Sequence, residues 1–131
     1  MSSDSVLKQK SMAFAKRIVR LYKFLTDERR EYIMSRQILR CGTSIGANIA
    51  EAIYGSSRKD FVAKLQIAQK EAAETLYWLE LLSSCEYIPD KLFRSMFQDC
   101  DELLSMLSAS IKTCTEQSLS RILYLISRIL L

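Results

Sequence analysis

Apolar residues recur along the chain at alternating steps of three and four, which is the spacing of one face of an α-helix. Four stretches carry this pattern, at 5–25, 31–54, 58–84 and 89–116, and short connections separate them. In the first stretch the inward positions are Leu7, Phe14, Ile18, Leu21 and Leu25, with Ser11 in the gap. Helices joined in this way pack most simply as an up-down-up-down bundle. We therefore expect an all-α, four-helix bundle.

The stretch 36–52 places small residues beside its apolar face. Gly42, Gly46 and Ala50 lie four residues apart. A glycine inside a helix costs roughly 1 kcal/mol relative to alanine, and close packing of another helix would offset that loss. The small residues that we expect to lie against the two glycines come from the next helix and are Ala68, Ala72 and Thr75.

A polar row on the same helix consists of Ser44, Asn48 and Glu51. Half-buried amide and carboxylate groups require partners. The arginines of this helix lie more than ~16 Å from Glu51 along the helix axis, so its partner must come from another helix or another subunit. Two interpretations follow, a polar network that sets helix register or a direct ligand contact. We expect packing and subunit register to be the role of Gly42, Ser44, Gly46, Asn48 and Glu51.

Charge is distributed unevenly around the net value of +4. Residues 1–40 hold ten Lys/Arg and four Asp/Glu, or +6, whereas residues 41–131 hold nine and eleven, or −2. Such a basic first third is suited to nucleic acid, to an acidic protein or to the acidic part of another copy. The candidate phosphate contacts are Lys16, Arg17, Arg20, Lys23, Arg36 and Arg40. The alternative is an ordinary solvated helix face.

The residues that most enzymes require are missing from this sequence. There is no histidine, which is the most common general base and transition-metal ligand. Glu71 and Glu74 resemble half of a di-iron site, but no histidine completes it. The four cysteines show no C-x-x-C spacing, and no phosphate-binding glycine motif is present. We expect no catalytic residue, no cofactor and no metal site.

The last stretch, 118–131, reads SLSRILYLISRILL and differs in character from the rest. We divide the chain into a bundle at 1–117 and this apolar tail. The tail is too short to span a bilayer. It is either an extension of the fourth helix buried in a subunit contact or an interfacial membrane helix, and its two arginines give little attraction to anionic lipid. With no apolar segment of a signal peptide at the N-terminus, we expect a cytoplasmic protein with reduced thiols.

The run RQILRCGTSIGANIAEA, followed by SSRKDFVAKLQIAQKEAAETLYWLELL and EYI, resembles the four-helix-bundle family also called the 23S rRNA intervening-sequence protein or S23 family. The resemblance covers roughly residues 10 to 115. The positions that carry the family's core pattern are Arg40, Ser44, Ile45, Asn48, Ile49, Ala50 and Glu51. The apolar tail is not typical of that family.

The resemblance implies a left-handed bundle and a homopentamer with a basic face. Some members are encoded inside inserts of large-subunit ribosomal RNA genes, and others are accessory proteins of diversity-generating retroelements. We accordingly expect a non-enzymatic, homo-oligomeric binding or scaffold protein that engages structured RNA or a ribonucleoprotein. The alternative is a protein–protein adaptor without nucleic acid, in which the basic first third contacts acidic residues around 99–102 of a neighbour.

Overall fold

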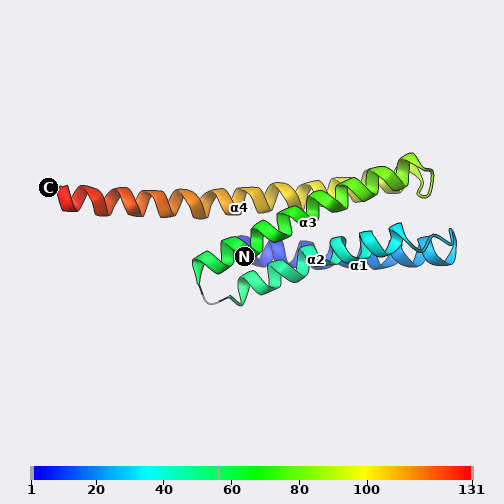
Figure 1. Ribbon diagram of the computed structural model, residues 1–131, viewed down its shortest axis with the longest axis horizontal. Coiled ribbons are helices and arrows are strands. Elements are labelled where there is room, and N and C mark those ends of the chain that lie inside the picture. Colours follow the sequence, from blue (N-terminus) through cyan, green and yellow to red (C-terminus); the bar gives the residue numbers. More distant parts are fainter. Residues whose placement is uncertain (1, 56, 131) are drawn as a thin grey trace.

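The computed structural model describes residues 2–55 and 57–130, and these residues form four helices and no strand. The helices are α1 (Ser3–Asp27), α2 (Met34–Ile53), α3 (Arg58–Ser84) and α4 (Asp90–Leu130). Figure 1 shows them lying lengthwise beside one another, with short connections at the two ends. The prediction of an all-α, four-helix bundle is confirmed. The handedness of the bundle stays a prediction.

The four helices surround one core. α1 packs on α2, α2 on α3, α3 on α4, and α4 returns to pack on α1. The predicted apolar stripes face this centre, and each helix contributes fully buried side chains. The largest of them include Ile18, Leu25, Ile38, Ile45, Ile49, Leu65, Leu79, Leu82, Met96, Leu103 and Leu107. Periodic burial of this kind provides most of a bundle's stability, because isolated helices are marginal in water.

The connection between α1 and α2 is longer than the sequence pattern indicated. α2 begins at Met34 instead of residue 31. Ile33 at the N-cap makes no side-chain hydrogen bond to the helix, and the Glu31 side chain accepts from the backbone there instead. Its carboxylate accepts hydrogen bonds from the backbone N–H groups of Ile33 (3.1 Å) and Ser35 (2.7 Å). These are among the N-terminal donors that have no partner within a helix. Glu31 therefore precedes α2 and does not belong to it.

α4 continues beyond the bundle. Its bundle part was expected to end near residue 116, and the structure continues one helix of 41 residues to Leu130. The described part of the tail therefore extends the fourth helix, which was one of its two interpretations. Asp4 of α1 and Phe61 of α3 line a hollow with Cys114 and Gln117 of α4. Beyond this hollow, residues 119–130 are all exposed. Figure 1 shows this end of α4 projecting past the other three helices.

Candidate nucleic-acid interface

The outward side of α1 carries a row of cations. Lys16, Arg20 and Lys23 are exposed, at steps of four and three, on the side of the helix opposite its buried stripe. Within the described part of the chain, no carboxylate forms an ion pair with any of the three. Their charges are therefore available to an anion from outside the protein.

Two further exposed arginines lie at one end of the bundle. Arg36 is exposed in the first turns of α2, and Arg30 is exposed in the connection that joins α1 to α2. Because that connection follows α1 directly, both residues lie at the same end of the bundle as Lys23. We call Lys16, Arg20, Lys23, Arg30 and Arg36 the basic face. Arg30 was missed by the sequence analysis because it lies outside every helical stripe.

The other two expected phosphate contacts bind carboxylates of their own chain. Arg17 Nη1 donates to Asp99 Oδ2 of α4 at 2.6 Å. Arg40 bridges two carboxylates of α3, with Nη1 3.2 Å from Glu71 Oε2 and Nη2 bonded to Glu74. Both arginines join neighbouring helices, and the other four expected residues form no ion pair within residues 2–55 and 57–130.

The predicted acidic patch of α4 is largely occupied in the same way. Asp99 accepts from Arg17, and Glu102 forms an ion pair with Lys10. Asp101, also exposed, has no ion-pair partner among the described residues. An adaptor in which this patch receives the basic third of a neighbouring copy would first have to break two contacts between α1 and α4.

The two glycines of α2 face α1, so the prediction that they lie against α3 is wrong. A Cβ added at Gly42 would lie 2.7 Å from Ile18 Cδ1, and one added at Gly46 would lie 3.4 Å from the Ser11 carbonyl oxygen. Neighbouring positions of a helix differ by about 100°, so the residue before Gly42 points toward a different helix. The Thr75 hydroxyl of α3 accordingly lies 3.2 Å from Cys41 Sγ and not against a glycine.

The polar row of α2 finds its partners within the chain. Ser44 Oγ donates to the Arg40 carbonyl at 2.6 Å, and Asn48 Nδ2 donates to the Ser44 carbonyl at 2.8 Å. Glu51 Oε2 lies 2.9 Å from Lys64 Nζ, so its partner comes from α3. Of these contacts, the Glu51–Lys64 ion pair joins α2 to α3, whereas the hydrogen bonds of Ser44 and Asn48 lie within α2. A role of this row in subunit register stays a prediction.

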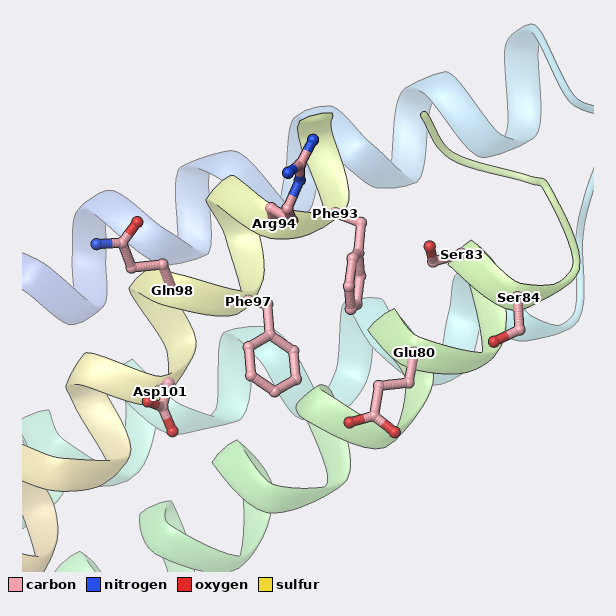
Figure 2. A pocket seen from close by; sticks show the side chains of 8 residues that line it. All are labelled: Glu80, Ser83, Ser84, Phe93, Arg94, Phe97, Gln98 and Asp101. Carbon is pink, nitrogen blue, oxygen red and sulfur yellow. The ribbon is translucent and has the colours of Figure 1, made fainter. Parts of the chain in front are cut away.

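A separate hollow of about 590 Å³ lies between α3 and α4. Figure 2 shows Phe93, Arg94 and Phe97 on the α4 side and Glu80 across from them on α3. The two phenylalanine rings lie 5.5 Å apart. None of the expected phosphate contacts lines this hollow, so it is distinct from the basic face.

The cysteines are free thiols with different exposure. Cys41 and Cys100 are buried, and burial raises the pKa of each thiol to about 12. A thiol with so high a pKa is protonated at neutral pH and is a poor nucleophile or metal ligand. Within residues 2–55 and 57–130, no group of three or more His, Cys, Asp or Glu side chains is arranged to hold a metal ion.

No described helix combines the length and apolarity that crossing a membrane requires. A comparison with curated proteins finds no match to the chain. The chain is similar to a protein of unknown function from the S23 ribosomal protein family of Bacteroides thetaiotaomicron VPI-5482, whose crystal structure was determined at 1.70 Å resolution. The two share 55% sequence identity with a TM-score of 0.83, over 85% of this chain and 99% of that one.

Residues 3–109 match the family described as 23S rRNA-intervening sequence protein. The matched range contains the basic face and all four helices up to the middle of α4. The chain therefore belongs to the 23S rRNA-intervening sequence protein family.

Proposed function

We propose that the protein is a cytoplasmic, non-enzymatic, homo-oligomeric binding protein whose basic face contacts the phosphates of structured RNA or of a ribonucleoprotein. The oligomer is a pentamer, as the family resemblance implies. One observation carries the proposal: Lys16, Arg20 and Lys23 form an exposed row, and the described residues provide no acidic partner for it.

Unpaired cations are the ones that contribute to polyanion binding. Each Lys or Arg that neutralises a phosphate releases condensed counterions, and this release drives sequence-independent affinity. Arg17 and Arg40 contribute less because carboxylates of α4 and α3 already neutralise them. Backbone contacts of this kind suit folded RNA, whose phosphates and 2′-hydroxyls are accessible when its bases are paired.

The family description supports an RNA ligand in a limited way. It names the intervening sequence of 23S rRNA, and the related crystal structure belongs to a family named for a ribosomal protein. The basic face lies inside the matched residues, so this part of the surface belongs to the family fold.

The direct test is charge reversal on α1. Fluorescence anisotropy with a labelled, structured RNA compares the wild-type protein with K16E/R20E/K23E. The control is K59E/K70E/K91E, which changes net charge equally but at exposed cations of α3 and α4. We expect the α1 variant to lose at least tenfold in affinity and the control to lose much less. Equal losses would contradict the assignment of the basic face.

The adaptor without nucleic acid remains the second candidate, and the exposed apolar end of α4 favours it. Under this alternative, K16E/R20E/K23E would dissociate a protein complex, while wild-type protein would bind no RNA even at low salt. Light scattering of the same two variants separates the cases. An unchanged oligomer mass together with lost RNA binding supports the RNA proposal.

A further inference from the structure

We propose that residues 119–130 of α4 form a self-association segment, in which the projecting ends of several copies pack as a parallel coiled coil of more than two helices. The segment would be one of the contacts between the subunits of the proposed homo-oligomer, so it rests on the homo-oligomeric part of the proposed function. It does not depend on RNA binding.

Within the described residues, no other part of the chain covers this segment. Every residue from 119 to 130 is exposed, and Ile129 and Leu130 are 82% and 79% exposed. Figure 1 shows that α1, α2 and α3 do not extend beside this end of α4. An unsupported helix of about 12 residues is marginal in water, and a contiguous apolar face of this size marks an interaction site.

The spacing within the segment matches a coiled-coil seam. Leu119, Ile122, Ile126 and Ile129 follow one another at steps of three, four and three, which places them at positions a, d, a and d of two heptads. Isoleucine occupies both d positions. In parallel coiled coils, isoleucine at d with leucine or isoleucine at a disfavours the two-stranded form and favours more helices.

The width of the apolar face also argues for more than two helices. Leu123 and Leu130 occupy e positions and Leu125 a g position, where a two-stranded coil normally carries charges. A helix whose e and g positions are apolar buries them against two neighbours. The seven apolar side chains are 46–82% exposed, so this whole face is available for burial by neighbouring copies.

The opposite side of the helix is polar and stays in water. It carries Ser120, Arg121, Tyr124, Ser127 and Arg128. Arg128 Nη1 donates to the Tyr124 hydroxyl at 3.4 Å, and its guanidinium carbon lies 5.9 Å from the centre of that ring. Two arginines provide weak attraction to anionic lipid, whereas the heptad seam is complementary to itself, so a second copy is the better occupant.

Closed homo-oligomers with cyclic symmetry place equivalent helices parallel around the axis. The family match ends at residue 109, so this contact is an addition to the family fold and not a part of it. The bundles would gather at one end of the coil and leave their basic faces outside it.

The test measures the mass of the full chain by light scattering. We expect a wild-type mass of at least three times the 15.1 kDa of one chain, and a lower mass for I122D/I126D. The matched control S120D/S127D adds the same charges on the polar side and should keep the wild-type mass. Circular dichroism should show that all variants retain the helical bundle, since residues 119–130 lie outside it.

The outcomes separate the two proposals. A wild-type monomer would overturn both the homo-oligomer and the self-association segment. If that monomer also floats with phosphatidylserine vesicles, the segment is an interfacial membrane helix instead. A wild-type oligomer whose mass I122D/I126D leaves unchanged would overturn the segment alone.

Crosslinking tests the parallel coil itself. In a Cys85→Ser/Cys114→Ser background, Ile129→Cys should form intermolecular disulfides several-fold faster than Ser127→Cys, because parallel helices bring equivalent d positions together. Equal rates would contradict the coil.

Discussion

Replacement of Gly42 by alanine tests how closely α1 and α2 approach. The new Cβ would lie 2.7 Å from both Cδ1 and Cγ1 of Ile18 and 2.9 Å from its Cγ2. Carbon atoms in good contact lie about 3.5–4.0 Å apart, so the added methyl group is almost 1 Å too close. Ile18 is fully buried and cannot turn into solvent. The two helices must therefore separate or Ile18 must leave its rotamer.

The free energies act in opposite directions. Alanine gains about 1 kcal/mol of helix propensity over glycine, whereas overpacking a core costs about 1–3 kcal/mol. All three contacts are with one rigid, β-branched side chain, so we place the cost at the upper end. We expect Gly42→Ala to lower the free energy of unfolding by about 1–2 kcal/mol, which at this chain length lowers the Tm by roughly 4–8 °C.

Gly46→Ala is the matched control on the same helix. Its Cβ would lie 3.4 Å from the nearest atom, the Ser11 carbonyl oxygen, so little must move. Helix propensity then dominates, and this variant should be neutral or more stable by up to about 1 kcal/mol. Thermal melts should show a lower Tm for Gly42→Ala and an unchanged or higher Tm for Gly46→Ala. Both variants are measured at one protein concentration, because the Tm of an oligomer depends on concentration.

A double-mutant cycle identifies the atoms responsible. Ile18→Ala alone should cost about 2–5 kcal/mol, and in that background Gly42→Ala should become stabilising because the clash is gone. The reasoning is refuted if Gly42→Ala and Gly46→Ala stabilise the protein equally, or if the effect of Gly42→Ala is unchanged in the Ile18→Ala background.

Three further predictions concern stability. Ser35→Ala should stabilise the protein by about 1 kcal/mol in urea melts, because the buried Ser35 hydroxyl has no hydrogen-bond partner among the described residues; destabilisation would show that it is bonded. Glu86→Gly should raise the Tm by a few degrees, since Glu86 has φ 65° in the left-handed region that favours glycine; a lower Tm would disprove this. The free energy of unfolding should fall above pH 9, because unfolding returns the thiols of Cys41 and Cys100 from a pKa of about 12 to their ordinary value of 9.0. The stabilisation that depends on these two protonated thiols is complete below pH 9 and is lost as the pH rises toward 12. Urea melts of Cys41→Ala/Cys100→Ala should show a smaller fall, and an equal fall would exclude the thiols.

The inward positions of the helices were predictable because burial follows the helical period. Leu7, Ile18 and Leu25 are buried as their spacing indicated. The partner of each face was not predictable in the same way. Periodicity shows that Gly42 lies beside an apolar stripe but does not show whether α1 or α3 covers that side of the helix.

The ion pairs were beyond sequence reasoning for a related reason. Arg17 and Asp99 are separated by 82 positions, and their meeting depends on the register of α1 against α4. Charge composition showed a basic first third without showing which cations the protein itself neutralises. The distinction between Arg20, which is unpaired, and Arg17, which is paired, required the packed structure.

The bundle part of the fourth helix was expected to end near residue 116 because the apolar stripe fades between residues 112 and 117, and an extension through the tail was left as one of two interpretations. A helix stops where its backbone is interrupted, and no glycine or proline occurs after Pro89. The polar stretch therefore continues as a helix that has left the bundle, and the apolar pattern resumes at Leu119. The absence of a stop residue was the better signal.

The central claim is that an unpaired basic face binds RNA through phosphates, and the salt dependence of binding tests it most directly. Anisotropy titrations of wild-type protein and K16E/R20E/K23E with structured RNA, over a salt series, give the slope of log K against log salt concentration. We expect steep wild-type salt dependence and a slope reduced by roughly 2–3 in the variant. Equal slopes, or no wild-type binding at low salt, would contradict the claim.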